Sequence, residues 1–184
     1  MTTENIFEEA HSESFDPEGL KKRTIQQTME VLPKGTRRLA AQLRTNLKFD
    51  SIWEVLTDYN NLSDFIPNLV SSKVISREGS KIRLKQVGSQ DFLGFRFSAE
   101  VFLELFEDQS NGTLRFYLLK GDFRRFEGSW TVNKFGPGGL SIIYELTVQG
   151  CFGTPVSLIE ERLRSDLTRN LLAVEQAASK IKII

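Results

Sequence analysis

The sequence contains few of the side chains that most often carry out catalysis or hold metals. Its 184 residues include one cysteine, Cys151, and one histidine, His11. A single cysteine excludes a disulfide within the chain, which fits a reducing compartment. One histidine, placed in the N-terminal segment, gives no material for a multi-histidine metal site or a histidine general base in the domain. We therefore expect neither a metal nor a cofactor, and we interpret Cys151 as a small apolar residue rather than a nucleophile.

Long apolar runs and a net charge are also missing. No stretch approaches the ~18 apolar residues of a membrane span, and the first residues lack the basic and apolar regions of a signal peptide. Lysine plus arginine and aspartate plus glutamate both number 24. This balance gives no reason to expect nucleic acid as a partner. We expect a cytoplasmic protein.

The N-terminal segment differs from the rest in its charge pattern. Residues 1–19 contain six acidic residues and no lysine or arginine, whereas residues 20–38 contain six basic residues and only one acidic residue. The breaker Pro33-Lys34-Gly35 closes the segment. We expect residues 1–36 to form a flexible extension, either solvated or used for docking, in which 20–32 could form a short helix. The domain is expected to span 37–184.

Alternation of apolar and polar residues predicts seven strands. Leu39, Ala41 and Leu43 alternate with polar residues, and after Pro67 the same period of two continues to residue 150, interrupted by turn sequences such as Asn111-Gly112. The expected strands are 37–47, 69–77, 81–89, 95–107, 113–120, 123–135 and 139–150. Their short connections predict an antiparallel meander with one apolar face.

Three helices complete the pattern. In residues 155–184, Leu163, Leu167 and Leu171 recur at helical spacing, which predicts one long amphipathic C-terminal helix. After the first strand, Ser51 and Glu54 have the spacing of a capping box and predict a short helix. A second short helical piece, 62–66, should end before Pro67.

The covering helices are too few for so wide a sheet. Seven strands at about 4.8 Å spacing span roughly 30 Å, whereas a helix with its side chains is about 10–12 Å across. The sheet must therefore curl around the C-terminal helix. We predict an α+β helix-grip fold, in which a curved seven-stranded antiparallel sheet wraps around the long C-terminal helix, with two short helices after strand one. Such a fold leaves room for an internal apolar cavity.

Three segments sharpen this prediction. TDYNNLSDFIPNLVSSKVISREGSKIRLKQVG (57–88), GDFRRFEGSW (121–130) and ERLRSDLTRNLLAVE (161–175) resemble the START-like helix-grip superfamily, in its polyketide cyclase/dehydrase and coenzyme-Q-binding (lipid transport) branch. The similarity covers about residues 37–180. The resemblance implies a pocket for a hydrophobic or aromatic ligand. It does not identify the ligand, because the family contains carriers, ligand-binding proteins and aromatase/cyclases.

The inward face of the sheet and the C-terminal helix supply the expected ligand contacts. Alternation places Arg124 on the same face as Phe126, where it could meet a carbonyl, phenol or carboxylate of a ligand; the alternative is an ion pair with Asp122 or with an acidic residue of the C-terminal helix. Asp166 is interpreted as a structural partner for an arginine. The expected ligand-binding residues are Phe97, Val101, Phe116, Leu118, Arg124, Phe126, Trp130, Tyr144, Leu163 and Leu167.

The segment after the first strand is expected to act as a lid. Tyr59, Phe65 and Pro67 belong to it, and a large ligand could enter only if this segment moves. The leading hypothesis is a protein that binds or carries a lipid, isoprenoid or quinone, with transient membrane contact possible and a protein partner unspecified. Two alternatives remain: a polyketide aromatase/cyclase that uses the same cavity, and an interaction module that acts through its surface. We nominate no catalytic residue.

Overall fold

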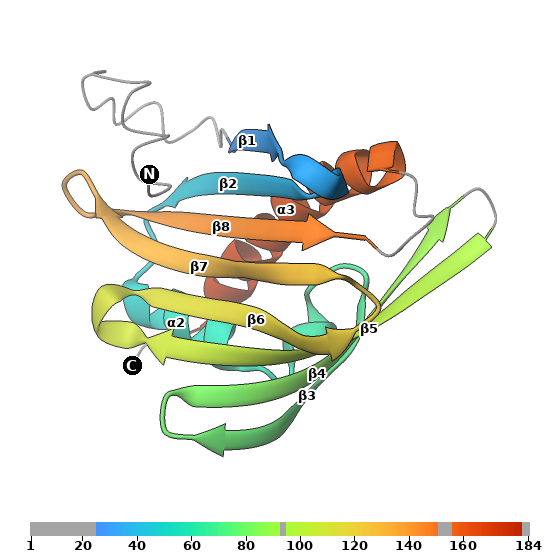
Figure 1. Ribbon diagram of the computed structural model, residues 1–184. Helices are drawn as coiled ribbons and strands as arrows, with labels where there is room; N and C mark the ends of the chain where they lie inside the picture. The colour runs from blue at the N-terminus through green and yellow to red at the C-terminus, as the bar shows by residue number, and fades with distance from the viewer. Residues whose placement is uncertain (1–24, 93–94, 151–155, 182–184) are drawn as a thin grey trace.

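The computed structural model describes residues 25–92, 95–150 and 156–181. A single antiparallel sheet of eight strands curves around the C-terminal helix α3, with a shorter helix α2 at one end (Figure 1). Its spatial order is β1-β2-β8-β7-β6-β5-β4-β3. The strands are β1 (Gln26–Val31), β2 (Arg37–Thr45), β3 (Leu69–Glu78), β4 (Lys81–Phe92), β5 (Phe95–Asp108), β6 (Thr113–Gly121), β7 (Arg125–Phe135) and β8 (Gly139–Gln149).

The seven expected strands correspond to β2–β8, and β1 is an addition. The expected helix over 20–32 is wrong, because Gln26–Val31 pairs along its whole length with β2. The sheet thus begins before residue 37, where we expected the domain to begin. A tertiary contact favours the strand over the helix: the Gln27 amide donates a hydrogen bond to the Arg164 carbonyl of α3 at 2.8 Å and another to the Thr168 hydroxyl. Residues 1–24 of the expected extension lie outside the described residues.

The helices differ in detail from the expectation. Helix α2 is Phe49–Thr57, with Lys48 at its N-cap position and no side-chain cap, so the expected capping box is wrong. The second piece is a single 3₁₀ turn, η3 (Leu62–Asp64). Helix α3 is Val156–Ala178, about 34 Å long at 1.5 Å per residue. Of the described helices, none combines the length and the apolar character needed to cross a membrane.

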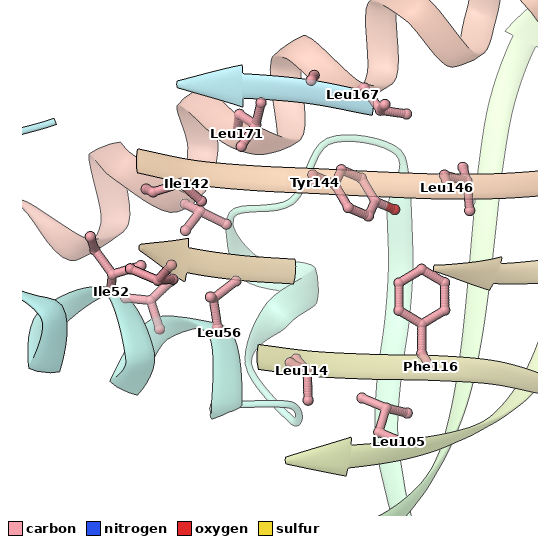
Figure 2. Packing of buried hydrophobic residues seen from close by; sticks show 14 of the residues in the cluster. Ile52, Leu56, Leu105, Leu114, Phe116, Ile142, Tyr144, Leu146, Leu167 and Leu171 are labelled. Atoms are coloured by element: carbon pink, nitrogen blue, oxygen red, sulfur yellow. The ribbon is translucent and has the colours of Figure 1, made fainter. Parts of the chain in front are cut away.

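Helix α3 lies mainly against β2, β8 and α2. Leu167, Leu171 and Val174 are almost completely buried, as is Ile142 of β8. Figure 2 shows Leu167 and Leu171 projecting from α3 beside the inward side chains of β8. An ion pair between Arg37 of β2 and Glu160 adds a polar tie between sheet and helix. This arrangement holds α3 over one half of the sheet.

Candidate functional site

Five aromatic rings form a continuous wall on the concave side of the sheet, four on β6, β7 and β8 and one, Phe123, in the connection before β7. Trp130 and Tyr144 are neighbours on paired strands, and their rings stack with centroids 4.0 Å apart and planes 6° apart. From Tyr144 the contacts continue through Phe116 (6.4 Å), Phe126 (5.8 Å) and Phe123 (5.2 Å). Inward-facing positions of strands alternate in sequence, which is why residues from three strands meet on one face. We call these five rings the aromatic wall.

The aromatic wall is buried at one end only. Phe116 and Tyr144 are 5% and 7% exposed, whereas Phe123, Phe126 and Trp130 are only half-buried. An apolar inward face of an antiparallel sheet is normally covered by the layer packed on it. The half-buried rings therefore mark the part of the face that the helices do not fully cover.

Gly128 of β7 makes room for this wall. A methyl group at this position would lie 2.0 Å from the Glu145 carbonyl oxygen of β8 and 2.7 Å from the ring of Phe116. The Phe116 ring thus occupies space that any other residue at 128 would take. The close approach of strand and ring requires a glycine here.

A polar cluster lies at the buried end of the wall. The Asn170 side chain lies within hydrogen-bonding reach of the Tyr144 hydroxyl, and Asp166 is one helical turn earlier on α3. Burial, and secondarily the Asp166 carboxylate, raise the pKa of the Tyr144 phenol, which the Asn170 amide partly offsets. The phenol therefore keeps its proton at neutral pH and stays a hydrogen-bond donor. Figure 2 shows Tyr144 close to Phe116 and Leu146 among the apolar side chains.

One polar atom of this cluster has no partner. The Oδ1 atom of Asn170 is buried and makes no hydrogen bond within the part of the chain that the structure describes. Most buried side-chain polar atoms in proteins are paired, so such an atom needs an explanation. It lies on the face of α3 that carries the apolar stripe.

The expected lid segment is fastened at both ends. At its start, Tyr59 is 2% exposed, and its hydroxyl donates a 2.6 Å hydrogen bond to Glu107 of β5, which also accepts two bonds from Arg77. At its end, the Asn68 amide donates a 3.1 Å hydrogen bond to Asp166 of α3. Asn68 has a left-handed backbone conformation, with φ of 64°, which asparagine tolerates better than most residues. The segment therefore closes onto α3 beside Tyr144.

The structure brings most of the expected site residues together on the concave side. Val101, Phe116, Tyr144 and Leu167 are buried in one core cluster, and Leu118, Phe126, Trp130, Leu163 and Phe65 pack against it with partial exposure. Pro67 is also half-buried. The side chain of Phe97 and the residue Cys151 lie outside the described part of the chain.

Arg124 does not have the expected position. The strand begins only at Arg125, so Arg124 belongs to the connection that precedes it, and its side chain is exposed. Its backbone N–H donates to the Gln149 carbonyl at 3.0 Å. The alternation argument assumed a strand from residue 123 and fails for this reason. Asp166, expected to pair with an arginine, accepts a hydrogen bond from Asn68.

Sequence reasoning missed Asn68 and Asn170. For Asn170 a signal was present, because it follows Leu163 by seven residues and Leu167 by three, which places an amide on the apolar stripe of the helix. For Asn68 the signal was weak, since asparagine after proline is usual in turns. Among the described residues, no group of three histidine, cysteine or acidic side chains could hold a metal ion.

The opposite, convex face carries a separate hollow. Its volume is about 330 Å³, and its lining consists of Phe106, Asp108, Thr113, Arg115 and Tyr117. Phe106 and Tyr117 are exposed and meet edge to face at 6.1 Å. This hollow is not the expected ligand cavity, because it lies outside the sheet. The internal cavity stays a prediction.

A sheet curved around a long C-terminal helix, with a short helical segment closing one end, is the helix-grip class of fold. Residues 45–175 match the family model described as polyketide cyclase / dehydrase and lipid transport. The chain belongs to this family. No curated protein gives a significant sequence match.

Solved structures with the same fold come from lipid-transfer and aromatase/cyclase proteins. A STAR-related lipid transfer protein from Xanthomonas axonopodis is similar with a TM-score of 0.74 and 15% identity, over 91% of this chain and 97% of that chain. The ZhuI aromatase/cyclase from Streptomyces sp. R1128 is similar with a TM-score of 0.62 and 14% identity, over 78% of this chain and 91% of that chain. Human StAR-related lipid transfer protein 5 is similar with a TM-score of 0.68 and 7% identity, over 85% of this chain and 82% of that chain. These likenesses establish the fold.

Proposed function

We propose that the protein binds or carries a hydrophobic ligand, such as a lipid, an isoprenoid or a quinone, between its sheet and α3. The observation that supports this most is the aromatic wall, which faces inward and yet is half-buried at Phe123, Phe126 and Trp130. The family contains lipid-transport proteins, and hydrophobic-ligand binding fits it.

Desolvation would supply most of the binding free energy. Each CH₂ group moved from water to an apolar site contributes about 0.8 kcal/mol. Transfer of an apolar tail from a bilayer would be close to neutral, so a carrier needs apolar surroundings of comparable quality and a way to open. The aromatic wall would provide those surroundings.

The lid would open at the Asn68–Asp166 contact. Tyr59 is buried and hydrogen-bonded to Glu107, so we propose that it anchors the segment while Phe65 and Pro67 move with the chain that follows. The side-chain hydrogen bond from Asn68 is exposed, and exposed contacts of this kind open at low cost. The gating part of the segment is then 62–68.

Native extraction tests the proposal. The full chain is purified from its own cells without detergent, extracted with organic solvent, and the extract is analysed by mass spectrometry. We expect a hydrophobic compound at close to one equivalent per chain. Its absence under several growth conditions, together with failure to bind a neutral apolar dye, would contradict the proposal.

A polyketide aromatase/cyclase acting in the same predicted cavity is the second candidate. It is supported by the protonated Tyr144 phenol, which could donate a hydrogen bond to a ligand carbonyl, and by the nearby Asp166. Incubation with a reactive poly-β-ketone chain, with wild type compared to Tyr144→Phe, tests it. A product distribution that matches the uncatalysed one in both proteins would remove this candidate.

A further inference from the structure

The amide of Asn170 has two ends in different situations. One end lies within reach of the Tyr144 hydroxyl, and the other, Oδ1, is buried without a hydrogen bond. An amide in a core would normally be paired at both ends, because an unpaired buried acceptor is destabilising. One covered acceptor at the buried end of the aromatic wall thus has no partner.

The chemistry around Oδ1 restricts what could pair with it. The partner must donate a hydrogen bond to an amide oxygen, and it would lie close to the Tyr144 hydroxyl, which can donate as well as accept. A hydroxyl group does both. It also carries no charge to be desolvated, unlike an ammonium group.

The charge of the cluster argues against an acid. The Asp166 carboxylate is close enough to raise the pKa of Tyr144, so a carboxylate or phosphate bound here would meet like charge. A bound acid would also offer no hydrogen to Oδ1. Esters and ethers are excluded because they have no hydrogen to donate to Oδ1.

We infer that Asn170 and Tyr144 form a subsite for the hydroxyl group of a neutral apolar alcohol or phenol, with the apolar part of that molecule along the aromatic wall. This inference rests on the proposed function, because it needs a ligand in the predicted internal cavity. It goes further by selecting among hydrophobic ligands: hydroxylated molecules bind, and acids or ethers of the same size bind more weakly.

Competition with a neutral dye separates the two claims. The probe 1,6-diphenyl-1,3,5-hexatriene, a hydrocarbon with no hydrogen-bonding group, reports on the apolar part of the predicted cavity alone. Unlabelled competitors are 1-decanol, decyl methyl ether and decanoate at pH 8, titrated against the full-length chain. We expect 1-decanol to displace the dye at least 10-fold more tightly than either of the others.

Two variants and two controls test the residues. Asn170→Leu, combined with Tyr144→Phe so that neither group is left unpaired, should abolish the preference for 1-decanol while the dye still binds. Tyr144→Phe alone should reduce the preference severalfold. Tyr117→Phe on the convex face and Asn46→Leu before α2 change the same residue types at exposed positions, and they should leave the preference unchanged.

Stability gives a second readout. If Asn170 serves binding, the double variant should unfold at a temperature equal to or above that of wild type, because it removes a buried unpaired acceptor. A marked fall in unfolding temperature would assign Asn170 to structure and overturn the inference. Dye binding with equal displacement by 1-decanol and its methyl ether would overturn the hydroxyl subsite alone, whereas no dye binding would overturn the proposed function.

Discussion

Two parts of the inward face of the sheet meet the helices in different ways. Under α3, β2 and β8 carry side chains with almost no exposure, such as Leu43 and Ile142, and the facing Leu171 is equally buried. On β7 the inward rings of Phe126 and Trp130 are half-buried. We infer that the face under α3 supplies stability and the half-buried end of the aromatic wall supplies binding. The following variants test that division from the largest expected effect to the smallest.

Leu171→Ala should have the largest effect. Its side chain is fully buried between α3 and the sheet, so its truncation should lower the free energy of unfolding by about 2–5 kcal/mol. Leu163→Ala on the same helix is the matched control, because Leu163 is only half-buried. Urea denaturation measures both. Equal losses would contradict the division into a densely packed and a loosely covered part of the interior.

Tyr59→Phe tests the anchor of the lid. It removes a hydrogen bond to the Glu107 carboxylate and should cost about 1.5–3 kcal/mol of stability. Tyr117→Phe, at an exposed tyrosine, should cost close to nothing. Dye affinity should change in neither variant, and a large change in Tyr59→Phe would mean that Tyr59 belongs to the moving part.

Phe126→Ala should affect binding more than folding. Because the ring is half-buried, we expect a stability loss of about 1–2 kcal/mol, below the usual range for a fully buried phenylalanine. The affinity for 1,6-diphenyl-1,3,5-hexatriene should fall several-fold, as measured by fluorescence titration. Unchanged affinity would place the dye away from the aromatic wall.

Asn68→Gly should have the smallest effect on stability. Glycine keeps the left-handed backbone and removes the hydrogen bond to Asp166. The free energy of unfolding should therefore fall by about 0.5–1.5 kcal/mol. Dye release, followed by stopped-flow fluorescence, should become faster. Lys34→Gly is the matched control, since Lys34 is also left-handed, with φ of 59°, and lies away from the lid. Faster release in both variants would show that the Asn68–Asp166 hydrogen bond does not specifically hold the lid closed.

Most of the fold could be predicted from local sequence, and the failures have tertiary causes. Strands β2–β8 alternate clearly, because one face is apolar and the other is wet. Strand β1 does not alternate, and what favours it is pairing with β2 and the contact from Gln27 to α3. Neither the pairing with β2 nor the contact to α3 can be predicted from the local sequence.

The candidate site was predicted less well than the fold. Four of the five wall residues followed from alternation, but Phe123 was not among them, and Arg124 was misplaced because the strand starts two residues later than the pattern suggested. Asn170 could have been found from its spacing along the helix, whereas its unpaired oxygen depends on what surrounds it. The hydrogen-bond partners of a buried polar group depend on the tertiary fold, so they cannot be predicted from sequence periodicity.

Gly128 has a consequence for anyone who wishes to redesign this protein for bulkier ligands. Because the missing side chain gives room both to the backbone of β8 and to the ring of Phe116, enlarging residue 128 would push apart two strands and tilt a ring at the same time. Engineering should leave this position alone. Shape changes are better made at Leu118 or Phe126, whose side chains are only partly buried.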